Sequence, residues 1–380
     1  MLSVRLLRGA RVAVLAQWVL VGLASWGTGL LLLGALGWAL SHPSGGAPHL
    51  LARLAWCAVP VVATAQFAAA VGRTQPAGWP RVGLAAAGLG GSGLVLLGTA
   101  TSVLVCAAGS VPALLAFLLL RGALGGAPFD GVGPGVLAAG HTLPPGGVVT
   151  LLAVVPLAAG VAGVARLRPG RHDSDGADVA AEEPRRAPAG LPWGVALVAV
   201  GLAVESGAPG HDVMPLPSGL GRIAPGAAGG WVLVTVGLVL AGPGLLDGCG
   251  RLLAGFHSGV VRLLAGRALQ REARRLGPAV GLLSATAAAA VSVYGLRQDA
   301  GHPLGPVTTF GAVLVAVCVL GTAVSAASES RAARRPAVEA LRGQAAPAAT
   351  LRAVAAVQTA VLLVVFLAPA TVVAALSNTP

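Results

Sequence analysis

The sequence predicts an all-α fold, a polytopic helical membrane protein with about nine transmembrane helices in two parallel repeats. Two observations carry this prediction. Of the 380 residues, 56% are hydrophobic and only 10% are charged, whereas a soluble domain carries about 25% charged residues. The apolar residues also gather in runs of about 20, which is the length that crosses the hydrocarbon core of a bilayer.

Nine apolar runs define the expected helices in chain order. They cover residues 12–40, 51–71, 93–120, 148–166, 192–206, 229–246, 277–296, 306–327 and 353–376. The run at 192–206 is short for a membrane span. The first run follows a basic start, as in a secretory signal peptide, but it is about twice as long as the apolar part of such a peptide. We therefore expect an uncleaved first helix.

The arginines predict the orientation in the plasma membrane. All 25 basic residues are arginine, and a cytoplasmic N-terminus places 21 of them on the cytoplasmic side, leaving Arg53, Arg121, Arg222 and Arg297 outside. Cytoplasmic loops carry an excess of basic residues, so this orientation is favoured. It places the C-terminus outside the cell. The same distribution explains the net charge of +12 without nucleic acid, which is the usual partner of a basic soluble protein.

The expected helices fall into two similar blocks, offset by about 260 residues. The first permease-like repeat covers 1–166 with four helices, and the second covers 277–380 with three helices. Each has two spans joined by a short loop, then a cytoplasmic stretch at 72–92 or 328–352, then a further span. Parallel duplication of this kind is common among transporters. The fourth helix of the second repeat is missing from the pattern, so either the C-terminus lies outside the cell or this repeat is shortened.

Three further segments lie between the repeats. Residues 167–191 carry charges of both signs with Pro and Gly, which predicts a solvated cytoplasmic linker. Residues 192–246 form two connecting helices. Residues 247–276 alternate arginine with Leu and Val at helical spacing, which predicts a basic amphipathic helix that lies on the lipids of the inner leaflet.

The composition excludes several kinds of chemistry. Without lysine the chain has no phosphate-loop lysine and no Schiff base, so it is not expected to be an ATPase or another enzyme. The four cysteines are scattered singly, which favours packing over a metal site or a disulfide, and no cofactor is expected. All thirteen acidic residues, Glu272 among them, fall in loops or at span ends, so an ion-coupled carrier is disfavoured. Glu205, at the end of the short fifth span, is the nearest to an exception.

One cytoplasmic stretch resembles a known family. The segment "RRPAVEALRGQAAPAATLRAVAAVQTA", residues 334–360, looks like the FtsX-like permeases of ABC transporters, of the two-copy actinobacterial type without a large extracytoplasmic domain. In that family a basic helix ending in "ALR", here residues 340–342, is followed by a turn and then by "LR", here Leu351 and Arg352. Gln358 stands where the family often has Gln or Glu. The turn reads Ala-Ala-Pro at residues 345–347 instead of Gly-Ala-Ser, and the first repeat has lost nearly all its basic residues at the corresponding place.

The resemblance implies a transport subunit that works with a separate P-loop ATPase to export or extrude a substrate, in contact with membrane lipid and with a second permease copy as a further partner. It also implies an ATPase-coupling segment in which arginines pair with acids of the ATPase while Val338 and Leu341 fill a groove. The residues of this segment are Arg334, Arg335, Val338, Leu341, Arg342, Leu351 and Arg352. Two alternatives stay open, namely a loop that contacts only lipid and water, and a degenerate permease with a scaffolding or regulatory role.

Overall fold

The computed structural model describes most of the chain, and nearly all of what it describes is helical. The described residues are 2–42, 46–74, 91–122, 143–165, 190–207, 214–215, 222–223, 225–255, 259–300, 305–343 and 347–377. Two strands of two residues each, β1 (Met214–Pro215) and β2 (Arg222–Ile223), pair antiparallel. The prediction of an all-α fold is therefore confirmed.

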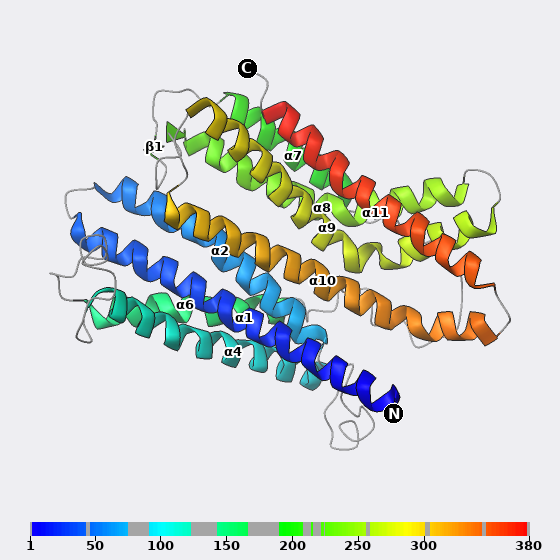
Figure 1. Ribbon diagram of the computed structural model, residues 1–380. Coiled ribbons are helices and arrows are strands. Elements are labelled where there is room, and N and C mark those ends of the chain that lie inside the picture. The colour runs from blue at the N-terminus through cyan, green and yellow to red at the C-terminus, as the bar shows by residue number, and fades with distance from the viewer. Residues whose placement is uncertain are drawn as a thin grey trace. The chain divides into compact units, whose positions relative to one another are not determined.

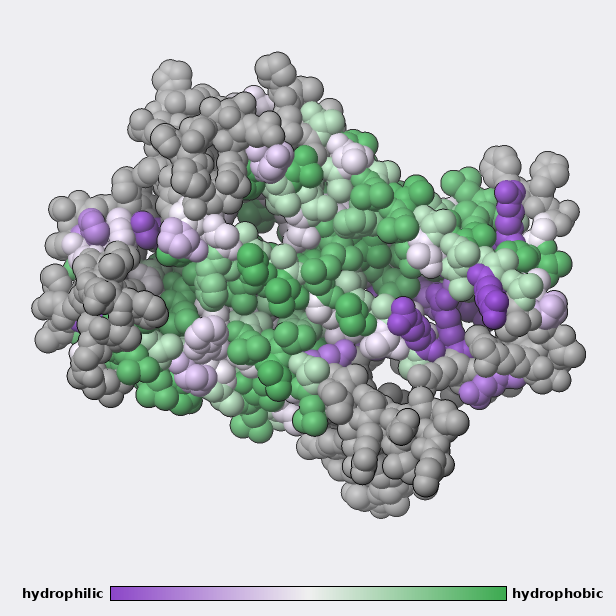
Figure 2. Space-filling view, in the orientation of Figure 1, coloured by the Kyte–Doolittle hydropathy of each residue, from purple (hydrophilic) through white to green (hydrophobic). Residues whose placement is uncertain are grey.

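Nine helices within these ranges are long and apolar enough to cross a membrane, and each covers one of the predicted runs to within one residue, the short fifth run included (Figure 1). They are α1 (Leu2–Ser41), α2 (Gly46–Thr74), α4 (Gly91–Leu120), α6 (Pro145–Ala165), α7 (Gly190–Gly207), α8 (Pro225–Gly255), α9 (Val260–Ala300), α10 (Pro306–Gly343) and α11 (Ala348–Ser377). Many aliphatic side chains on them are exposed, such as Leu104 and Val161, and hydrophobic residues cover much of the face in Figure 2. A lipid environment accounts for this surface.

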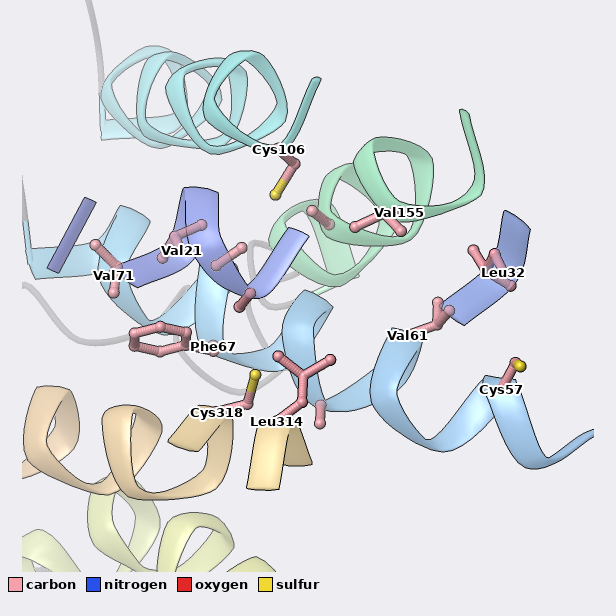
Figure 3. Close-up of a cluster of buried hydrophobic side chains, with 14 of the residues drawn as sticks. Val21, Leu32, Cys57, Val61, Phe67, Val71, Cys106, Val155, Leu314 and Cys318 are labelled. Atoms are coloured by element: carbon pink, nitrogen blue, oxygen red, sulfur yellow. The ribbon is translucent and has the colours of Figure 1, made fainter. Parts of the chain in front are cut away.

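The chain divides into two compact units, and the first combines the N-terminal helices with the first part of α10. Unit 1 comprises Met1–Asp178, Leu216–Gly219 and Leu304–Thr322. Its core holds Val21, Phe67, Cys106 and Val155 from α1, α2, α4 and α6, together with Leu314 and Cys318 from the first part of α10 (Figure 3). The first part of α10 therefore packs with the first repeat, so the repeats expected at 1–166 and 277–380 do not coincide with the compact units.

Unit 2 comprises Val179–Pro215, Leu220–Pro303 and Ala323–Pro380. Its main core joins α8, α9, α10 and α11 through Leu246, Leu269, Ala326 and Val365. The connecting helices α7 and α8 pack as a hairpin with their backbones close together. A Cβ added at Gly201 would lie 2.7 Å from the carbonyl oxygen of Gly230. Small residues allow this close approach.

The structure corrects the prediction for residues 247–276. Instead of one amphipathic helix, they form the end of α8 and the beginning of α9, separate helices that both continue into membrane-spanning segments. The two pack closely, since a Cβ at Gly266 would lie 2.5 Å from the carbonyl oxygen of Gly250. The apolar side chains that suggested a lipid-facing stripe, such as Leu252, Val260 and Leu263, are exposed, whereas the neighbouring Leu269 and Ala273 of α9 are buried in the core of unit 2. The predicted linker, apart from its end at 190–191, and most of the stretch at 72–92 lie outside the described residues.

The same hydrogen bond recurs in both repeats. Ser25 Oγ on α1 donates to the carbonyl oxygen of Cys106 on α4 at 2.7 Å, and Ser284 Oγ on α9 donates to that of Phe366 on α11 at 2.9 Å. Ser284 lies 259 residues after Ser25, and Phe366 lies 260 residues after Cys106. The serines end the related stretches "VGLAS" and "VGLLS". These contacts support the duplication that the sequence predicts.

Candidate functional site

The predicted coupling residues all lie on the described backbone, on either side of the connection between α10 and α11. α10 ends at Gly343 and α11 begins at Ala348. The helix α10 carries Arg334, Arg335, Val338, Leu341 and Arg342, and α11 carries Leu351 and Arg352. Of these side chains the structure describes only Arg334 and Arg352, and those of Arg335, Val338, Leu341, Arg342 and Leu351 lie outside the described part. Figure 2 shows hydrophilic side chains gathered at this end of unit 2.

Arg334 joins three helices. Its Nε and Nη2 atoms donate to Oε1 and Oε2 of Glu272 on α9, which makes a two-pronged ion pair, and its Nη1 donates to Oε1 of Gln358 on α11. Paired N–H donors of a planar guanidinium match the two oxygens of a carboxylate, and such bonds are stronger than those between neutral groups. We call Glu272, Arg334 and Gln358 the polar clamp.

The polar clamp is largely removed from water. Glu272 is 7% exposed and Gln358 is 3% exposed, while the side chain of Arg334 is 31% exposed. Apolar residues of the unit 2 core lie within four residues of Glu272 along α9, namely Leu269, Ala273 and Leu276. A buried charge is tolerated when it is paired and hydrogen-bonded. The clamp meets this condition because both carboxylate oxygens and the amide oxygen accept hydrogen bonds from one guanidinium.

The structure revises the role expected of Arg334. The family resemblance implied that its guanidinium pairs with acids of an ATPase, whereas in the structure it is bound to Glu272 within the chain. Glu272 was missed as a functional residue because it was assigned only to a span end. The available signal was its position as the one acidic residue among four arginines in residues 267–275. Exposed charges at the same end include Arg331, Glu339 and Arg352.

The first repeat joins the corresponding helix ends differently. Gly98 on α4 lies 260 residues before Gln358, and it faces Gly72 on α2. A Cβ added at Gly98 would lie 2.8 Å from the carbonyl oxygen of Gly72. The backbones of α2 and α4 are therefore in contact where long side chains bridge α10 and α11 in the second repeat.

Glu205, the exception considered in the sequence, joins α7 to α8. Its Oε1 accepts a hydrogen bond of 2.8 Å from Nε1 of Trp231, and its Oε2 is buried without a hydrogen-bond partner among the described residues. Three of the four cysteines, Cys57, Cys106 and Cys318, are buried in the apolar core of unit 1. Across the part of the chain that the structure describes, His, Cys, Asp and Glu form no group able to hold a metal ion.

Comparisons of the chain with models of protein families, with curated proteins and with solved structures found no match. The class that the fold defines is an all-α polytopic membrane protein.

Proposed function

We propose that this chain is the membrane-spanning permease subunit of an ABC transporter, which uses ATP hydrolysis by a separate P-loop ATPase to export or extrude a substrate across the plasma membrane. The observation that carries the proposal is α10, a single helix that runs from a membrane-spanning segment into the basic coupling segment. At about 1.5 Å per residue, its 38 residues extend about 57 Å, well beyond the hydrocarbon core of about 30 Å.

A permease without its own nucleotide site needs a surface on which an ATPase can act. The extension of α10 beyond Arg334 supplies one, because backbone hydrogen bonds connect it continuously with the span. Arginines on it, Arg335 and Arg342, suit an acidic surface of an ATPase. In this proposal the arginine distribution places the N-terminus and the α10–α11 connection in the cytoplasm and the C-terminus outside. Lipid surrounds the spans, and a second permease copy is a further partner.

A pull-down of the tagged full chain from detergent-solubilised membranes tests the proposal. The native chain is expected to bring down a P-loop ATPase, recognised by its phosphate-binding loop in mass spectrometry. A variant with Arg335→Glu and Arg342→Glu is expected to lose it, and Arg331→Glu, an exposed change on the same helix, is expected to keep it. Arg334 is left unchanged because its replacement would disturb the polar clamp. A folded native chain that binds no such ATPase would overturn the proposal.

The second candidate is a degenerate permease with a scaffolding or regulatory role. The observation that favours it is the first repeat, which has lost nearly all the basic residues at its coupling stretch and in which the helix backbones are in contact at Gly72 and Gly98. In that case the pull-down returns other membrane proteins and no ATPase.

A further inference from the structure

We infer that the polar clamp is a positioning device, which fixes the coupling segment on α10 to α9 and α11 so that a force on the segment moves the three helices together. This inference rests on the proposed function and adds three residues to it, Glu272, Arg334 and Gln358. None of them contacts the ATPase in this scheme. They act through the coupling residues that follow on α10.

The clamp lies where three membrane spans end. Glu272 comes three residues before the span Arg275–Tyr294 of α9, Arg334 is the last residue of the span Pro306–Arg334 of α10, and Gln358 lies six residues into the span Arg352–Val372 of α11. Neighbouring antiparallel spans meet at one side of the membrane in this way. The clamp therefore connects the bases of the three spans at the point where α10 leaves the membrane.

The clamp also supports α10 at a weak point. Pro336 lies within α10, two residues after Arg334, and proline has no N–H to donate to the carbonyl oxygen four residues earlier. The helix thus lacks one of its own hydrogen bonds beside Arg334. Bonds from Arg334 to two other helices hold the chain there. From Arg334 to Arg342, the helix extends about 12 Å. The part of α10 that carries the coupling segment is therefore short, and the polar clamp holds it at its beginning.

The geometry of the clamp constrains direction as well as distance. A two-pronged pair between Glu272 and Arg334 fixes the plane of the guanidinium, and the bond from Nη1 to Gln358 fixes it from a second side. A lysine in place of Arg334 would keep the charge and lose this fork. The first repeat has glycine at the position of Gln358, as described above, so the device belongs to the second repeat.

The test uses the full chain in lipid nanodiscs with the ATPase captured in the pull-down. The variants are Arg334→Gln, Glu272→Gln, the exchange Glu272→Arg with Arg334→Glu, and the exposed control Arg331→Gln. The first readout is ATP hydrolysis stimulated by the permease. The second readout is made on the permease alone, in a chain whose native cysteines are replaced. It is the distribution of distances between spin labels attached at Arg271→Cys on α9 and Glu339→Cys on α10, which are both exposed positions.

Both single changes are expected to leave the ATPase bound, to lower stimulated hydrolysis by about fivefold or more, and to broaden the distance distribution. The control is expected to change neither. The exchange is expected to restore both readouts, because the amide N–H₂ of Gln358 can donate a hydrogen bond to a carboxylate at position 334. Arg334→Lys is the variant of choice if the exchanged chain does not fold, and it is expected to give an intermediate distance width.

Unchanged distances and unchanged hydrolysis in the single variants would overturn the inference. So would a loss of hydrolysis with unchanged distances, because the residues would then act at the ATPase itself. If the native chain binds no ATPase, the proposed function fails, and the distance measurement still decides whether the clamp holds α10.

Discussion

Removing Arg334 is expected to destabilise the protein because Glu272 then loses the partner of a buried charge. Breaking a buried ion pair from one side costs about 3–5 kcal/mol. The side chain of Arg334 is 31% exposed, so water reaches the pair and lowers the expected cost of Arg334→Ala to about 2–3 kcal/mol. The change Glu272→Ala leaves the arginine, which can turn to solvent, and is expected to cost about 1–2 kcal/mol.

The double variant separates the pair from the packing of its side chains. Because Arg334 and Glu272 interact directly, the losses of unfolding free energy in the two single variants are expected not to add. The double variant is expected to lose about 1–2 kcal/mol less than the sum of the two single losses. The assay is unfolding of the purified chain by SDS in mixed micelles, followed by tryptophan fluorescence. The exposed control Arg331→Ala is expected to stay within about 0.5 kcal/mol of the native chain. A coupling energy below about 0.5 kcal/mol would refute the ion pair and with it the clamp.

Three other predictions concern packing, repetition and orientation. Gly98→Ala is expected to cost about 1–3 kcal/mol, because its methyl group would meet a facing carbonyl oxygen at 2.8 Å. In the same SDS assay, Gly34→Ala, with no neighbouring atom of the described residues within 4 Å, is expected to gain about 0.5–1 kcal/mol. Ser25→Ala and Ser284→Ala are expected to cost similar amounts, about 0.6 kcal/mol and at most about 1.7 kcal/mol each; a difference above about 1 kcal/mol between them would contradict their equivalence. Glu339→Cys, in a chain without its native cysteines, is expected to react with a membrane-impermeant maleimide only after the cells are permeabilised, and labelling of intact cells would contradict the orientation.

Most of the fold could be predicted because membrane spans are encoded locally. A run of apolar residues as long as the bilayer is thick has few alternatives to a helix, since lipid offers no partner for backbone N–H and C=O groups. Even the run at 192–206 forms a helix of 18 residues, α7. The helices outside the spans were harder to predict. In residues 247–276 the same pattern of Arg and Leu fits one helix on lipid and two helices packed together. The end of α8 at Gly255, the start of α9 at Val260 and the burial of Leu269 distinguish the two only in three dimensions.

The candidate site was found in part. The sequence and the family resemblance indicated Arg334 and noted Gln358, because they lie near one another on a segment with a recognisable pattern. Glu272 lies 62 residues before Arg334, and nothing in the local sequence pairs the two. A charged residue is not counted as part of an apolar run. From the sequence alone, an acidic residue buried at the end of a span therefore cannot be distinguished from an acidic residue exposed to solvent. The partner of Arg334 could therefore be identified only from the packed helices.

The recurring serine contact bears on the order in which the two repeats acquired their features. Ser25 and Ser284 make the same bond at positions 259 residues apart; under the duplication that the sequence predicts, this contact was present in the ancestral half. The polar clamp is found at one of the two corresponding places. Under the same prediction, it was gained or lost after the duplication. Homologues that diverged soon after this duplication would carry either two clamps or none. Their residues at the positions matching Gly98 and Gln358 would show which half changed.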